Sequence, residues 1–391
     1  MIVRLTQQAL QVQLAHLELL LLLLPSISFS QLPTIDGIAA APDDWLLGQG
    51  QKWHHRTVPA NEPAALLVRM PNSAEERVIE RAKEIIKKSS AKSLMLMKGN
   101  EVVWSGYREP ANASSFFFSF SIGKTVTSMA IGQAICAGKL SLQDKAEKWV
   151  TEIAGTDLGS ATVQQLLKMS SATPSINPDS TIMSSSQKSD LLSGKISFVD
   201  ILKNPGITKA KQASFSGKSK PGEAFDYHST DPLLLGVILN RATGTTYAKW
   251  TEEMVFKSAG LKYQAIVGQD HFGYGQADGN MRMKLEDCGR FALWVKNAES
   301  ATGCFSDYVR DASKTQIKNS PKRVGKAFDG YGYLIWAENS RQQNSYWAVG
   351  YGGQRIAWNH KNKRMLVAFS NLEDYMDDVY TLYRDWAALP D

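Results

Sequence analysis

The spacing of apolar residues predicts one amphipathic helix early in the chain. Segment 73–88 reads SAEERVIERAKEIIKK, and its apolar residues recur at intervals of three and four. They are Val78, Ile79, Ala82, Ile85 and Ile86. Residues at this spacing share one face of a helix. We therefore expect an outer helix that lays this face on the rest of the protein.

Strand patterns occupy both ends of the chain. Segment 93–109, SLMLMKGNEVVWSGYRE, contains two runs of strand-forming residues joined at Lys98, Gly99 and Asn100, which is typical of a β-hairpin. The carboxyl-terminal part favours strands again, followed by a helix over about 374–388. The strands predicted there are 331–337, 345–351, 354–360 and 364–371.

The order of these elements predicts an α+β fold. Strands from the two ends of the chain would form one antiparallel sheet flanked by helices, and the middle, about 126–325, would be a large and mostly helical insertion. We expect a single domain over 31–391, with its sheet part at about 74–125 and 326–391.

The first thirty residues have the pattern of a signal peptide. Arg4 precedes an apolar run over 17–24 that only Glu18 interrupts, and small residues follow at Ser28 and Ser30. This order is typical of a secretory leader, and the run is too short for a stable membrane span. We therefore expect a periplasmic or secreted protein.

Composition narrows the function further. The chain has 391 residues, 43% of them hydrophobic, and a net charge of +6. Its basic clusters, 81–92 and 203–222, lack interleaved aromatic residues, so they are expected to be solvated surfaces and not a nucleic-acid site. Three cysteines allow at most one disulfide and leave one thiol, so no disulfide framework is expected. The six histidines lack metal-ligand spacing, and neither a metal nor another cofactor is expected.

The pattern Ser-x-x-Lys occurs three times, and only one copy lies in apolar sequence. The copies are Ser89 with Lys92, Ser185 with Lys188, and Ser121 with Lys124. Chance alone predicts roughly one or two. Ser121 and Lys124 lie in SFSIGKTVTSMAIGQAICAGKL, whereas the other two lysines are expected to be hydrated. Three residues along a helix share a face, so the Lys124 amine should reach the Ser121 hydroxyl.

A serine beside a buried lysine is suited to nucleophilic catalysis. Burial disfavours a charged amine, so Lys124 is expected to accept the proton of Ser121. The positive end of the helix dipole would also favour a nucleophile at this position. The structural alternative is that Ser121 only caps the helix, a role that serine fills well.

Two later segments complete a family pattern. PGEAFDYHSTDPLLLGVILNRATG (221–244) places Tyr227 and Ser229 just before an apolar helix, and VGYGGQ (349–354) is a glycine-rich strand edge. With Ser-x-x-Lys, Tyr-x-Ser and this glycine motif in order, the chain resembles serine hydrolases of the penicillin-binding-protein and class C β-lactamase type. The resemblance runs from about residue 75 to 391 and includes TVQQLLKMSSATPS and GNMRMKLEDCGRFA.

The resemblance implies a role for each motif residue. Ser121 would be the acylated nucleophile, Lys124 would help to remove its proton, and Tyr227 would act as the partner base and acid. The backbone N–H groups of Ser121 and Gly353 would form the oxyanion hole. Ser229 would orient Lys124 through a hydrogen bond.

The glycine motif departs from the family pattern in a way that bears on the substrate. Gly350 and Tyr351 replace a lysine and a threonine that hold a substrate carboxylate in lactamases and transpeptidases. Gly352 keeps this edge free of a side chain, although a bulge or tight sheet packing would also explain the glycines. A neutral pocket walled by Tyr351 and Trp336 would suit a small-molecule carboxylic ester or small linear amide. The motif is similar to the branch with esterases and 6-aminohexanoate-dimer hydrolases.

Two other functions remain open at this point. The first is action on β-lactams or cell-wall D-Ala-D-Ala peptides, with Arg355 or another cation in place of the missing lysine. The second is a non-catalytic binding or sensor module that keeps the fold. The presence of Ser121, Lys124 and Tyr227 together favours an enzyme.

Overall fold

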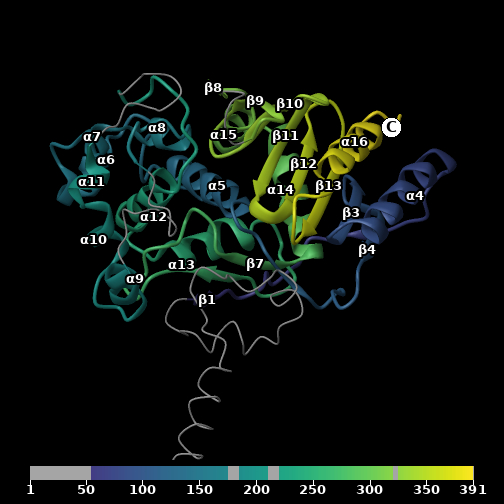
Figure 1. Ribbon diagram of the computed structural model, residues 1–391, viewed down its shortest axis with the longest axis horizontal. Coiled ribbons are helices and arrows are strands. Elements are labelled where there is room, and N and C mark those ends of the chain that lie inside the picture. Colours follow the sequence, from purple (N-terminus) through teal and green to yellow (C-terminus); the bar gives the residue numbers. More distant parts are fainter. Residues whose placement is uncertain (1–53, 175–184, 210–219, 320–324, 391) are drawn as a thin grey trace, which may run out of the picture. The chain divides into compact units, whose positions relative to one another are not determined.

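A computed structural model describes residues 54–174, 185–209, 220–319 and 325–390. They belong to one compact unit, Ile35–Asp391 (Figure 1). The predicted signal peptide over 1–30 lies outside the described residues, and so do parts of the polar segment 171–220. In the described ranges, no helix combines the length and the apolar character needed to cross a membrane.

The main sheet joins the two ends of the chain, as predicted. Within the described residues it has nine strands in the order β2-β4-β3-β13-β12-β11-β10-β9-β8. Neighbouring strands are antiparallel except β2 and β4, which are parallel, and β3 pairs with β13. The strands are β2 Leu67–Val68, β3 Ala91–Lys98, β4 Glu101–Tyr107, β8 Ile317–Lys318, β9 Phe328–Tyr331, β10 Trp336–Asn339, β11 Gln342–Gly350, β12 Gln354–Asn359 and β13 Arg364–Ser370.

Local sequence explains several of these elements. The predicted hairpin is confirmed as β3 and β4, and Gly99 in its turn has φ +59°, a left-handed conformation that glycine adopts without strain. The predicted helix is confirmed as α4, Ser73–Lys88, whose amino end is held by a capping box between Asn72 and Glu75.

One predicted strand is wrong. Segment 331–337 is not continuous, because β9 ends at Tyr331 and β10 begins at Trp336. Leu334 in the corner between them has φ +55°, its N–H donates to the Leu167 carbonyl, and its carbonyl accepts from Thr125. The corner therefore forms because its backbone bonds to other elements, which the apolar pattern of 331–337 does not reveal.

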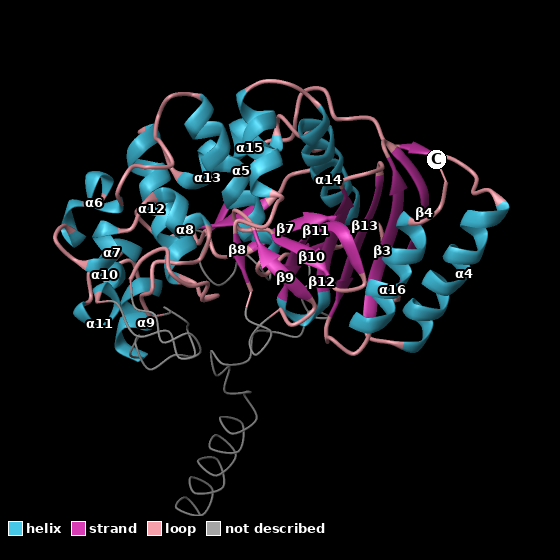
Figure 2. Cartoon of the chain, turned by 90° about the horizontal axis from the view of Figure 1, so that it is seen from above, coloured by secondary structure: helices cyan, strands magenta, loops and turns pink. Residues whose placement is uncertain are grey.

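Helices cover both faces of the sheet. Figure 2 shows α4 and α16, Met376–Ala387, on one side of the strands and α14, Leu285–Ser300, on the other. The helix α16 confirms the one predicted over 374–388. Buried apolar residues of α4 face β3 and β4, and this burial of one face is what stabilises an amphipathic helix in a protein.

The middle of the chain is mostly helical, as predicted, with α5, Ile122–Cys136, at its centre. This helix contacts α12 and α15, and most of its residues are buried. The other helices are α6 Ala146–Trp149, α7 Asp157–Ser160, α8 Val163–Leu167, α9 Ser185–Leu192, α10 Phe198–Leu202, α11 Pro205–Thr208, α12 Thr230–Thr243, α13 Tyr247–Thr251 and α15 Cys304–Ala312.

A second sheet leads into α5, and the sequence did not predict it. Within the described residues it has four short strands in the order β1-β6-β7-β5. They are β1 His54–Arg56, β5 Phe116–Phe118, β6 Ile266–Gly268 and β7 Met281–Lys284. Because β5 ends only a few residues before α5 begins, this sheet fixes where the central helix starts.

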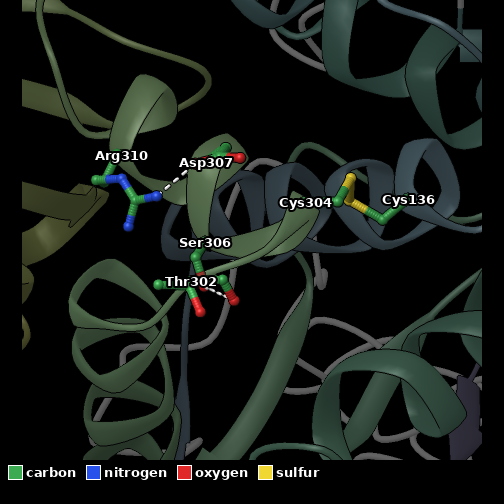
Figure 3. Close-up of a disulfide and its surroundings, with 6 residues drawn as sticks. All are labelled: Cys136, Thr302, Cys304, Ser306, Asp307 and Arg310. Carbon is green, nitrogen blue, oxygen red and sulfur yellow. Dashed lines mark hydrogen bonds and ion pairs between the residues drawn. A yellow bond between two sulfur atoms is a disulfide. The ribbon is translucent and has the colours of Figure 1, made fainter.

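One disulfide fastens the other end of α5. Cys136, the last residue of α5, is bonded to Cys304, the first residue of α15 (Figure 3). Cys288 is the remaining thiol and is buried in α14, where burial raises its pKa well above the usual value. The pairing agrees with the prediction of at most one disulfide, although the partners could not be chosen from sequence.

Candidate active site

Ser121 lies at the amino end of α5 and binds the predicted lysine. It occupies the N-cap position, but its side chain makes no capping hydrogen bond. Instead, the Lys124 Nζ donates to the Ser121 Oγ over 2.9 Å. Capping alone therefore does not explain the serine, and the predicted serine–lysine contact is present.

Lys124 is held between two neutral oxygens. Its side chain is buried, with the residue 3% exposed, and its Nζ also donates to the Asp278 carbonyl over 2.6 Å. It forms no ion pair with any carboxylate of the described residues. An amine held in this way is placed to exchange a proton with the serine hydroxyl.

The loop that holds Lys124 is fastened to α5 at three points. Besides the Lys124 contact, the Thr127 Oγ1 donates to the Ala277 carbonyl over 2.6 Å. Gly123 allows the closest approach, because a Cβ there would lie 2.9 Å from the Gly279 Cα. The sequence analysis missed Asp278, since a contact through a backbone carbonyl leaves no side-chain signature.

Tyr227 lies beside Lys124. The Lys124 Nζ is 5.2 Å from the centroid of the Tyr227 ring. The phenol oxygen makes no hydrogen bond to Ser121 or Lys124, all three of which are among the described residues. Proton transfer through Tyr227 therefore requires the three groups to move closer when substrate binds, as is common for catalytic contacts in unliganded enzymes.

A group of aromatic rings packs against Tyr227. Trp336 stacks on it with ring centroids 5.2 Å apart and planes inclined by 29°, and Tyr331 meets it edge-on at 6.1 Å. Trp336 is only 2% exposed. Trp336 was expected to wall the substrate pocket. Because it is buried against Tyr227, it can affect the site only through Tyr227.

The neighbours of Tyr227 have different surroundings. Ser229 is the N-cap residue of α12, and neither of the two hydrogen bonds of the Lys124 amine goes to it. Its predicted role in orienting Lys124 thus stays a prediction. His228 is buried, and its Nε2 lies 3.4 Å from the Asp231 Oδ2, so no Ser-His pair forms with Ser121.

The glycine-rich edge lies against the residues that precede Ser121. Strand β11 ends at Gly350, where a Cβ would lie 2.4 Å from the Ser119 carbonyl oxygen. Gly352 and Gly353 follow with φ +71° and +98°, and a Cβ on Gly353 would lie 2.6 Å from the ring of Tyr375. A side chain would clash at Gly350 and Gly353, and the left-handed backbone of Gly352 favours glycine. The edge is thereby brought next to Ser119, two residues before the nucleophile.

Tyr351 in this edge and Arg355 in the following strand differ in exposure. Tyr351 is 74% exposed, and its ring centroid lies 5.7 Å from that of Phe120. Arg355 is buried, and its Nη1 donates to the carbonyls of Gly350 and Gln354 over 2.8 Å each. The guanidinium is thus held by backbone oxygens, which does not favour it as a replacement for the missing lysine.

The other two Ser-x-x-Lys copies do not resemble this site. The Ser89 Oγ donates to the Ile85 carbonyl at the end of α4, and Lys92 lies in β3. Lys92 is buried, so the expectation that it is hydrated is wrong. The side chains of Ser185 and Lys188 lie outside the described residues. No group of His, Cys, Asp and Glu suited to a metal ion occurs in the part of the chain that the structure describes.

Comparison with known proteins finds relatives among named hydrolases and penicillin-binding proteins. The chain is 23% identical over 287 residues to the 6-aminohexanoate-dimer hydrolase of Paenarthrobacter ureafaciens, covering 69% of each protein. It is 26% identical over 204 residues to penicillin-binding protein 4* of Bacillus subtilis (strain 168), covering 47% of this chain and 41% of that protein. The chain thus spans less than half of the second relative.

A solved structure shows the same fold. A Bacillus anthracis protein, provisionally named a 6-aminohexanoate-dimer hydrolase, superposes with a TM-score of 0.65 at 17% identity, covering 91% of this chain and 97% of that chain. A family model described as beta-lactamase matches residues 82–389, which include Ser121, Lys124, Tyr227 and the glycine-rich edge. The chain therefore belongs to the beta-lactamase family, whose members are serine hydrolases.

Proposed function

We propose that the protein hydrolyses a carboxylic ester or a small linear amide through an acyl-enzyme on Ser121. The observation that carries this proposal is the 2.9 Å hydrogen bond between the Lys124 Nζ and the Ser121 Oγ, in a site lined by Tyr227. A nucleophile within hydrogen-bond distance of its base, itself held by a third group, is the arrangement that covalent catalysis needs.

In the first half-reaction the Ser121 oxygen attacks the substrate carbonyl carbon while its proton passes to Lys124 or Tyr227. The carbonyl oxygen becomes negative in the tetrahedral intermediate and is stabilised by the N–H groups of Ser121 and Gly353. The bond to the leaving group then breaks, and Tyr227 protonates the departing alcohol or amine. A water molecule next attacks the acyl-enzyme by the reverse route and releases the carboxylic acid.

The neutral glycine-rich edge favours this substrate class over β-lactams. Gly350 and Tyr351 offer no cation for a carboxylate, and the nearby Arg355 is occupied by backbone carbonyls. The similarity to the relative from Paenarthrobacter ureafaciens, which is named a 6-aminohexanoate-dimer hydrolase, supports this choice.

The proposed location is the periplasm or the outside of the cell. The disulfide between Cys136 and Cys304 supports it, because disulfides persist in oxidising compartments. The leader pattern in 1–30 points the same way. The test is to sequence the amino terminus of the mature protein after fractionating its native cells. A protein found intact from Met1 in the cytosol would contradict export.

A fluorophosphonate probe and an ester substrate test the catalytic proposal directly. The probe should label Ser121, and Ser121→Ala should abolish both labelling and turnover. Ser89→Ala is a matched control, because it removes the serine of another Ser-x-x-Lys copy and should leave both intact. Turnover that survives in Ser121→Ala would end the proposal.

A fluorescent penicillin separates the remaining alternatives. Covalent labelling of Ser121 by penicillin, with no turnover of esters or amides, would favour the cell-wall or β-lactam reaction. Failure of both probes on correctly folded protein would favour the non-catalytic module.

A further inference from the structure

A second group of aromatic rings lies beside Ser121, separate from the group behind Tyr227. Phe120 contacts Tyr351 with ring centroids 5.7 Å apart, and it contacts Phe118 edge-on at 4.5 Å. Among the described residues, neither Phe120 nor Tyr351 has a ring contact with Tyr227. The nucleophile is thus flanked by two distinct aromatic surfaces, and only the one behind Tyr227 serves the proposed acid and base.

Phe120 is held in a strained conformation directly before the nucleophile. Its φ is +43°, in the left-handed region that an aromatic residue rarely adopts. Its carbonyl accepts hydrogen bonds from the Gly123 N–H at 3.0 Å and from the Ser119 Oγ at 3.1 Å, so the conformation is fixed by the start of α5. Strain of this kind persists where the surroundings impose it and is concentrated at functional sites.

Tyr351 is largely exposed to solvent, which is unusual for an aromatic side chain. It is 74% exposed, and its hydroxyl makes no hydrogen bond to any described residue. Phe120, which directly precedes Ser121, and Tyr351 therefore form an apolar rim on one side of the nucleophile. Aromatic side chains beside a reactive group are typical linings of a ligand site.

We propose that this apolar rim selects substrates that carry a bulky apolar or aromatic group next to the scissile bond. The inference rests on the proposed function and specifies its substrate class: neutral esters or amides with such a group on the acyl side or on the leaving side. An apolar substituent that packs against the rim is removed from water, and this burial favours its binding. Small or carboxylated substrates gain nothing from it.

The test compares three esters in a pH-stat assay, with ethyl acetate as the common reference. Ethyl octanoate enlarges the acyl group, and benzyl acetate enlarges the leaving group. Burying roughly 50–60 Å² of apolar surface on one ring corresponds to about tenfold in kcat/KM. We therefore expect the wild type to prefer at least one bulky ester. The ester that is preferred shows whether the rim contacts the acyl group or the leaving group.

Tyr351→Ala should reduce that preference about tenfold, whereas Tyr351→Phe should keep it because the ring remains. Phe120→Ala gives a second, independent reading, with folding checked by circular dichroism. Met70→Ala is the matched control, since Met70 is 86% exposed and follows β2 at the far edge of the sheet. It should leave the preference unchanged.

Failure of this inference is distinguishable from failure of the proposed function. A wild type that hydrolyses ethyl acetate through Ser121 but shows no preference, or a preference that Tyr351→Ala leaves intact, overturns the inference alone. If none of the esters is hydrolysed, labelling rates of Ser121 by ethyl and octyl fluorophosphonates give the same comparison. Absence of labelling by both overturns the proposed function and the inference with it.

Discussion

Removing the disulfide between Cys136 and Cys304 should destabilise the protein by an amount that the structure lets us estimate. The two residues are separated by 168 positions in the sequence. In the chain-entropy description, closing a loop of this length lowers the entropy of the unfolded chain enough to stabilise the fold by about 5 kcal/mol at 25 °C. Disulfides usually contribute less, so we expect a loss of about 2–5 kcal/mol.

The loss should appear as a lower melting temperature with unchanged chemistry. For a chain of this size it corresponds to a decrease in Tm of about 3–7 °C. The disulfide is at the opposite end of α5 from Ser121, roughly 20 Å away for a helix of this length. Well below the melting transition, kcat of the reduced protein should therefore equal that of the oxidised protein.

The assay is differential scanning calorimetry with and without the reductant TCEP, alongside the double variant Cys136→Ser, Cys304→Ser. TCEP should lower the Tm of the wild type to that of the double variant and should not affect the double variant itself. Cys288→Ala is the control for thiol loss, and it should keep the full response to TCEP because Cys288 is not in the disulfide.

Two results would refute this reasoning. An unchanged Tm, after mass spectrometry has verified that both cysteines are reduced, would show that the disulfide does not stabilise the fold by lowering the entropy of the unfolded chain. A cross-linked peptide that contains Cys288 would show that the pairing is different.

Three further predictions concern the site and the sheet. Gly123→Ala should lower kcat/KM about 10–100-fold, because its Cβ would lie 2.9 Å from the facing loop and push that loop away from the lysine; steady-state kinetics on folded protein checks this. Trp336→Leu should lower kcat about tenfold through Tyr227 and destabilise the fold by about 2–4 kcal/mol, as chemical denaturation would show. Hydrogen bonds from Arg69 hold the pKa of Glu75 at about 2, below its usual 4.5, so this buried carboxylate contributes about 3 kcal/mol above pH 4.5 that is lost as the pH falls toward 2. In Glu75→Gln, the stability measured by urea unfolding should depend less on pH over that window.

The elements that could be predicted are those whose pattern is local. Helix α4 and the β3–β4 hairpin follow from the spacing of their own residues, and the structure has both where the sequence placed them. The corner at Leu334 and the four-stranded sheet could not be predicted in this way. Their strands have only three or four residues, and contacts distant in sequence decide where each strand ends.

In the candidate site, too, contacts within one helix could be predicted and contacts between separate segments could not. Helix geometry alone brings Lys124 to Ser121, so the sequence was sufficient for that contact. The Asp278 carbonyl and the position of Trp336 behind Tyr227 depend on how separate segments meet. Lys92 was expected to be hydrated, but it is buried because β3 is an inner strand of the nine-stranded sheet.

The polar residues of α5 explain how an almost completely buried helix keeps its catalytic end in register. Close packing of apolar side chains already resists rotation of a buried helix, and a buried hydroxyl or amine must in addition find a partner. Three hydroxyl side chains bond to three separate segments: Thr125 to the Leu334 carbonyl, Thr127 to the Ala277 carbonyl, and Ser128 to the Tyr308 hydroxyl. These bonds point in different directions around the axis, so they fix the rotation of the helix. Because these hydrogen bonds fix the helix, they also fix the contact between Ser121 and Lys124. Burial by the surrounding apolar residues is the reason why each of these hydroxyls needs a partner.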